Sequence, residues 1–99
     1  MIRIYCKTHH SQNKSVLAAA DAELIGKTLI DDRIEFFVSP GFYKGEITDE
    51  KNLLEKIQNA DSVNLIGKKV VGIAVKNGLI KKEDTITIDN HPHAIIILV

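Results

Sequence analysis

The sequence has no tryptophan, a single cysteine among 99 residues and no net charge, and each of these absences excludes a class of protein. One cysteine cannot form a disulfide within the chain, so a disulfide-stabilised secreted scaffold is excluded and a reducing compartment is expected. Thirteen basic residues are balanced by thirteen acidic ones. This balance removes the long-range attraction to polyanions on which strongly basic nucleic-acid binders rely, although it leaves room for a local basic patch.

Long apolar runs and targeting signals are also lacking. No run approaches the roughly 18 apolar residues that a membrane-spanning helix needs, and Lys7 comes too early for the apolar region of a signal peptide. We therefore expect an intracellular, cytoplasmic protein without a membrane partner. A hydrophobic content of 44% at balanced charge excludes a disordered tail. This length predicts one domain over residues 1–99.

The N-terminal part of the sequence predicts a β-hairpin. Apolar and polar residues alternate over 2–7, which is the period of a half-buried strand, and Cys6 is expected to point into the core. A second apolar run covers 15–20, so we predict a hairpin over residues 2–20. Asp21 is expected to cap a short helical turn that Gly26 ends.

A third strand and a first helix are predicted next. Residues 34–38 alternate in polarity, and Pro40-Gly41 suits the centre of a type II turn. Thr48, followed by two acidic residues, is typical of a helix start, and an apolar stripe at helical spacing continues to Ala60.

The C-terminal part predicts a second helix and two strands. A cap at Ser62 and helical apolar spacing over 63–77 indicate the helix, which Gly78 ends. Residues 85–88 alternate in polarity. Residues 94–99 are apolar at every position, so we expect this last strand to be central and covered on both faces.

These elements predict an α+β fold, a two-layer sandwich in which a mixed or antiparallel sheet carries two helices on one face. A two-layer sandwich leaves the other face of the sheet in water, whereas the last strand is apolar on both faces. Either the segment 21–30 covers that second face, or a second copy of the chain forms a homodimer through the C-terminal strand. We expect the homodimer.

Two groups of side chains are candidates for binding RNA. Lys68, Lys69 and Lys76 decorate the second predicted helix, and a basic helix face suits phosphate binding, although such a face is often only solvated. Phe42 and Tyr43 lie in a glycine-bracketed loop. Exposed aromatic rings there would stack on bases, and buried rings would complete the core.

Histidines near the last strand are candidates for catalysis or metal binding. His91 and His93 flank a proline, and His9 and His10 end the first predicted strand, but this spacing is not specific for a metal. We therefore assign no metal site and no cofactor. A buried His93 beside a carboxylate would be a general-base candidate. No set of residues at catalytic spacing can be assembled from the sequence.

Several short motifs occur in an order that resembles one family. They are Leu24-Ile25-Gly26-Lys27, Phe42-Tyr43 with Gly45, Asn64-Leu65-Ile66-Gly67 and Pro92-His93-Ala94. In this order and spacing the chain resembles the small archaeal proteins called domain of unknown function 424. The resemblance implies an archaeal cytoplasmic protein with a compact two-layer α/β fold, and it implies no established activity. The positions shared with the family would be Gly26, Tyr43, Gly45, Asn64, Gly67, Pro92 and His93.

Two departures from that pattern argue against a polar or metal site at His93. His91 lies outside the pattern, and Ile95 stands where a polar residue is more usual.

Two functions follow as hypotheses. The first is a non-enzymatic binding module for RNA or the translation machinery, with Lys68, Lys69, Lys76 and Tyr43 as contact residues. The alternative is a small enzyme or metal protein that uses His93, with Asn64 and Tyr43 as polar partners. That alternative requires the three side chains to lie within about 10 Å of one another, close enough for hydrogen bonds or one bridging water.

Overall fold

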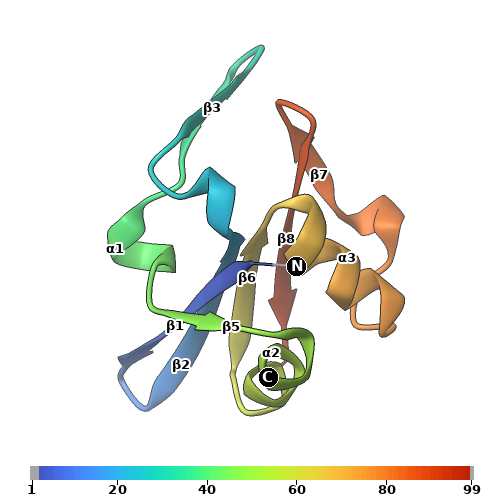
Figure 1. Ribbon diagram of the computed structural model, residues 1–99. Coiled ribbons are helices and arrows are strands. Elements are labelled where there is room, and N and C mark those ends of the chain that lie inside the picture. Colours follow the sequence, from blue (N-terminus) through green and yellow to red (C-terminus); the bar gives the residue numbers. More distant parts are fainter. Residues whose placement is uncertain (1–2, 99) are drawn as a thin grey trace.

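The computed structural model describes residues 3–98 and contains a six-stranded mixed sheet in the order β5-β1-β2-β6-β8-β7 (Figure 1). Its strands are β1 Ile4–Ser11, β2 Lys14–Asp21, β5 Glu46–Thr48, β6 Ser62–Ile66, β7 Ile86–Ile88 and β8 His91–Ile97. A separate hairpin is formed by β3 Thr28–Asp31 and β4 Ile34–Phe37. The helices are α1 Pro40–Tyr43, α2 Glu50–Gln58 and α3 Lys68–Lys76, with single 3-10 turns at η1 Ala22–Leu24 and η2 Lys82–Asp84. Ile2 and Val99, which were predicted to belong to strands, lie outside the described residues.

The sheet consists of two antiparallel halves joined by one parallel pairing. β1 pairs with β2 and β5 in the first half, and β8 pairs with β6 and β7 in the second. The parallel pairing of β2 with β6 connects them. The α+β class, the mixed sheet and the N-terminal hairpin are therefore confirmed.

The helices α2 and α3 cover one face of the sheet, called here the helix face. The core on this side is aliphatic and draws on β1, β2, β6, β8 and both helices; its largest buried members include Ile4, Leu17, Leu53, Ile57, Val63, Leu65 and Val70. Cys6 is buried in the same cluster, as expected. Burying so many aliphatic side chains supplies most of the driving force for folding.

Residues 22–43 cover part of the opposite face, called here the loop face. This segment contains η1, β3, β4 and α1, and Figure 1 shows its hairpin projecting beyond the end of the large sheet. Side chains of this segment and of the sheet form a second buried cluster between them: Ala18, Ala20, Leu24, Leu29, Val38, Tyr43, Ile66 and Ile88. Because the sheet is packed on both faces at this end, two layers do not fully describe the fold.

The predicted helix over 63–77 is wrong for its first residues, because Ser62–Ile66 forms the strand β6. Val63 and Leu65 are buried on the helix face, and Asn64 lies on the other side. Gly67, at φ 121, then turns the chain into α3. An apolar strand covered on both faces satisfies a helical spacing as well as a strand spacing, so periodicity alone could not separate the two.

Two local predictions are corrected. Pro40-Gly41 begins α1 instead of forming a type II turn, and the Tyr43 amide donates to the Ser39 carbonyl at 2.9 Å. Asp49, not Thr48, caps α2 by accepting the Asn52 amide at 2.9 Å. The short strands β3 and β5 were not predicted.

The last strand is only partly covered. Ala94 and Ile96 are buried against the helix face, whereas Ile95 and Ile97 are 57% and 68% exposed on the loop face. The prediction of cover on both faces is therefore wrong, because residues 22–43 reach only the His93 end of β8. Within residues 3–98, no helix is both long enough and apolar enough to cross a membrane.

Candidate functional site

Tyr43, Asn64 and His93 converge on the loop face through two hydrogen bonds. The Tyr43 hydroxyl donates to Asn64 Oδ1 at 2.5 Å, and His93 Nε2 lies 3.2 Å from the same oxygen. An amide oxygen only accepts hydrogen bonds, so His93 donates through Nε2–H and its Nδ1 is the unprotonated nitrogen. The sequence predicted that these three side chains could form a site, and their geometry satisfies that requirement.

Each of the three side chains comes from a different element. Asn64 projects from β6 toward the loop face, His93 projects from the neighbouring strand β8, and Tyr43 descends from α1. Phe36 lies against the His93 ring, with centroids 5.1 Å apart, and Phe42 packs edge-on against Tyr43 at 4.9 Å. The segment 22–43 therefore covers these three hydrogen-bonded side chains with aromatic rings.

Burial keeps the Tyr43 hydroxyl and the His93 imidazole in their neutral forms. Tyr43 is 2% exposed and His93 is 9% exposed. Burial raises the pKa of Tyr43 to about 12 and lowers the pKa of His93 below its usual value. At neutral pH the imidazole therefore retains an unprotonated Nδ1, the form that serves as a base or a metal ligand. Within residues 3–98, no three His, Cys, Asp or Glu side chains are arranged to hold a metal ion.

The predicted lysines lie around α3, away from Tyr43. Lys69 pairs with Glu23 at 3.1 Å, and Lys76 pairs with Glu50 at 2.9 Å. Because α3 lies on the helix face and Tyr43 on the loop face, the sheet separates the aromatic ring from the lysines. The predicted contact set Lys68, Lys69, Lys76 and Tyr43 thus does not form one surface.

Lys68 lies at a groove between α3 and β7, with a volume of about 370 Å³. Its apolar wall contains Val71, Val75 and Pro92, and its polar groups come from Lys68, Lys82, Thr85 and Thr87. Gly72 also lines this groove, and a Cβ placed there would meet no atom within 4 Å. Gly72 therefore borders open space at this groove.

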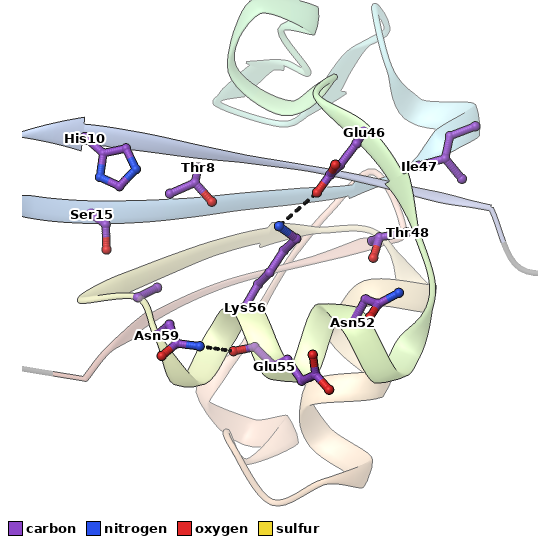
Figure 2. A pocket seen from close by; sticks show the side chains of 11 residues that line it. Thr8, His10, Ser15, Glu46, Ile47, Thr48, Asn52, Glu55, Lys56 and Asn59 are labelled. Atoms are coloured by element: carbon purple, nitrogen blue, oxygen red, sulfur yellow. Dashed lines mark hydrogen bonds and ion pairs between the residues drawn. The ribbon is translucent and has the colours of Figure 1, made fainter.

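A second groove, of about 600 Å³, lies between β1 and α2 (Figure 2). It is lined mainly by polar side chains: Thr8 and His10 from β1, Ser15 from β2, Glu46 and Thr48 around β5, and Asn52, Glu55, Lys56 and Asn59 from α2. Sequence reasoning missed this groove, because it depends on the short strand β5, whose three residues carry too weak a pattern to predict.

Asp21 is a further residue whose role the sequence did not reveal. It is buried at the end of β2, where its carboxylate accepts the backbone amides of Lys69 and Val70 at 3.0–3.1 Å. It therefore caps α3, 48 residues away, and forms no side-chain bond to the adjacent turn η1. A side chain at Gly67 would overlap this carboxylate. Burial raises the pKa of Asp21, and the two amide donors oppose that rise.

Comparison with known proteins places the fold within a family. A crystal structure of an uncharacterized conserved protein from Methanopyrus kandleri is similar, with a TM-score of 0.79 and 22% identity. The similarity covers 98% of this chain and 94% of the other. No curated protein matches the sequence significantly. The family model described as protein of unknown function DUF424 matches residues 8–99, so the chain belongs to that family, as the motifs predicted.

Proposed function

We propose that the protein is a non-enzymatic, archaeal cytoplasmic module that binds RNA in the groove between α3 and β7. The observation that carries this proposal is Gly72, a glycine in the middle of a helix that borders open space between two lysines. Glycine costs about 1 kcal/mol relative to alanine at such a position. Within residues 3–98 no neighbouring atom requires the small residue, so the open groove supplies its reason.

The groove combines the two kinds of contact that a nucleotide needs. Val71, Val75 and the bare backbone at Gly72 offer an apolar wall for a base or ribose. Lys68 and Lys82 lie at the same groove, and neither takes part in an ion pair within residues 3–98. Their ammonium groups are thus available for phosphate, whereas Lys69 and Lys76 are partly neutralised by acidic partners.

The lysine composition points to weak sequence preference. Only Arg3 and Arg33 among the thirteen basic residues carry the guanidinium that reads bases bidentately. Binding through Lys68 and Lys82 is therefore expected to depend on salt more than on sequence. Tyr43 is not part of this proposed surface, because it is buried on the other side of the sheet.

The test is fluorescence anisotropy with a labelled RNA stem-loop across a salt series. We expect the double variant K68Q/K82Q to weaken binding and to reduce the salt slope by about 2, one unit for each phosphate contact. The matched control K14Q/K51Q removes two exposed lysines that lie outside this groove. Absence of binding at low salt, binding that ignores salt, or equal losses in both double variants would each contradict the proposal.

Gly72→Ala separates ligand binding from stability. The added methyl group narrows the groove but has open space in the unliganded protein. We expect the free energy of unfolding to rise by about 1 kcal/mol, while RNA affinity falls. Unchanged affinity in a stabilised variant would show that RNA does not enter the groove.

A small enzyme that uses His93 as a general base is a second candidate, favoured by the convergence of Tyr43, Asn64 and His93. In this role Asn64 orients the imidazole and leaves Nδ1 free to take a proton. The candidate requires substrate to reach that nitrogen. Diethyl pyrocarbonate acylates accessible unprotonated imidazole, so peptide mass spectrometry after treatment at neutral pH tests it. Modification at His93 is expected, and complete protection there would exclude a catalytic role.

A further inference from the structure

The outer edge of β1 is open over half of its length. β5 pairs with β1 only from Ile4 to Cys6, whereas β1 continues to Ser11. Within residues 3–98, no strand pairs with the outer side of Thr8–Ser11. The sheet therefore ends there in a segment whose backbone groups on that side are free.

The hairpin at the end of β1 identifies these backbone groups. Gln12 and Asn13 have φ angles of 51 and 64, as in a two-residue type I′ turn closed by the pair Ser11–Lys14. The closing pair of such a turn is hydrogen-bonded, and hydrogen-bonded pairs alternate along an antiparallel ladder. Odd-numbered residues of β1 therefore bond to β2, and the amides and carbonyls of Thr8 and His10 point outward.

Gly45 explains why the pairing of β5 with β1 does not extend beyond Cys6. The chain crosses the edge of the sheet at this residue, and a side chain there would overlap the Cys6 carbonyl oxygen. On the loop face, His9 Nε2 lies 2.8 Å from the Phe42 carbonyl oxygen, and the rings of His9 and Phe42 stack at 4.7 Å. The open edge is thus bordered by Phe42 on the loop face.

The polar groove borders the same edge on the helix face. Figure 2 shows Thr8 and His10 on one side of it and the side chains of α2 on the other. The pair Lys56–Glu46, at 2.8 Å, spans the groove where β5 begins. A strand continuing the line of β5 along Thr8–Ser11 would lie between this groove and Phe42.

Nothing in the sequence of this edge protects it from another strand. Exposed edges usually carry lysine, proline or a bulge, and Thr8–Ser11 contains only threonine, two histidines and serine. The groove also contains Glu55, an exposed carboxylate that forms no ion pair within residues 3–98, whereas Lys56 is occupied by Glu46. The available charge in the groove is therefore negative.

We propose that β1 binds an extended, basic peptide segment of a partner protein, which adds as a strand beside Thr8–Ser11. Peptide residues opposite Thr8 and His10 would place polar or basic side chains in the groove, near Glu55. The residue opposite His9 would place an apolar side chain against Phe42. This mode of recognition gains affinity from main-chain hydrogen bonds and selectivity from alternate side chains. It is independent of the proposed RNA groove, which lies on the other side of α3.

The probe is the synthetic peptide Thr-Lys-Val-Lys-Thr, acetylated and amidated at its ends, titrated into ¹⁵N-labelled full-length protein. We expect the largest amide shifts at Thr8 and His10. We also expect this peptide to bind at least tenfold more tightly than Thr-Glu-Val-Glu-Thr, a difference on the order of one charge-assisted contact. Absence of binding, shifts centred elsewhere, or equal affinity for the two peptides would overturn the proposal.

A pair of variants at one position isolates the backbone contact. His10→Pro removes the outward amide and leaves the bonds between β1 and β2, whereas His10→Ala keeps the amide. We expect His10→Pro to bind the lysine peptide about tenfold more weakly than His10→Ala, in line with one lost hydrogen bond. Equal affinities would rule out strand addition.

Charge reversal on α2 provides a test that leaves the strand unchanged. Glu55→Lys is expected to weaken binding of the lysine peptide, and Glu83→Lys, an exposed position outside the groove, is the control. Equal effects would overturn the assigned peptide chemistry. Concentration-dependent dimerisation that His10→Pro abolishes would also overturn it, because a second copy would then occupy the edge.

Discussion

The two faces of the sheet are stabilised by different interactions. The helix face buries a continuous aliphatic cluster beneath α2 and α3. The loop face has a smaller cluster, two partly buried hydrogen bonds to Asn64, and exposed isoleucines at its far end. The comparison indicates that the helix face supplies most of the stability, whereas the loop face fixes the position of a few polar groups.

The largest effect is expected on the helix face. Leu65 is fully buried between the sheet and the helices. Leu65→Ala should lower the free energy of unfolding by about 2–5 kcal/mol, because it removes buried methyl groups and leaves a cavity. Urea denaturation measures this change. A loss below about 1 kcal/mol would mean that the helix face is loosely packed and does not supply most of the stability.

The next largest effect concerns the neighbouring residue on the loop face. Asn64→Leu removes the acceptor shared by Tyr43 and His93, and it should cost about 2–4 kcal/mol because two buried donors lose their partner. Tyr43→Phe should cost only about 1 kcal/mol. Combining the two changes should cost less than their sum, since the single changes share one interaction. If the two free-energy losses measured by urea denaturation are strictly additive, the hydrogen bonds to Asn64 do not act as a unit.

Asp21 is the polar exception on the helix face, and its replacement should have an intermediate effect. Asp21→Ala removes the cap of α3 and should cost about 1–2 kcal/mol. Asp21→Asn retains one acceptor and avoids burying a charge, so it should cost less. Thermal unfolding monitored by circular dichroism distinguishes the two variants, and equal losses would contradict a capping role.

Acidification should affect the two faces with opposite sign. Burial lowers the pKa of His93 from 6.5, so below that value the unfolded chain takes up a proton that the folded protein refuses. The stability from this group is present above pH 6.5 and is lost as pH falls toward its lower folded pKa. Asp21 has a pKa raised from 3.8, so folding is favoured as pH falls through its folded pKa. His93→Gln should flatten the loss of stability between about pH 7 and pH 5, and an unchanged slope in urea denaturation would contradict this assignment.

The smallest effect is expected at the uncovered end of the loop face. Ile95→Ala should change the free energy of unfolding of the monomer by less than about 0.5 kcal/mol, since the side chain is mostly in water. The proposed homodimer through β8 predicts a larger loss that grows with protein concentration. Unfolding curves recorded across a dilution series therefore decide whether a second copy covers Ile95 and Ile97.

Local signals in the sequence predicted part of the fold well. The alternation over residues 2–7 and the apolar run over 15–20 predicted the hairpin β1–β2. Gly78 ends α3 as expected, with the Leu79 amide donating to the Ala74 carbonyl at 2.9 Å. Elements whose partners are distant in the chain were harder to predict. β6 satisfied two periods at once, and Asp21 carried a helix-cap signal whose true partner lies 48 residues away.

The candidate sites divide in the same way. Tyr43, Asn64 and His93 were singled out as residue types with useful chemistry, and they meet because three separate elements converge on the loop face. The lysines were correctly placed on one helix, but their acidic partners Glu23 and Glu50 belong to other segments. Ion pairs between distant segments cannot be read from spacing, so the prediction from sequence counted Lys69 and Lys76 as unpaired positive charges.

The parallel pairing of β2 with β6 has a consequence for how the chain folds. Each antiparallel half of the sheet contains a tight hairpin, and hairpins of this kind close within microseconds. The pairing between the halves must wait until the intervening residues 22–61 have closed a long loop, which is the slower kind of event. We therefore expect the rate of folding to be set where Ala19 meets Leu65, and a chain stalled before that step would expose the edges of both halves to other molecules.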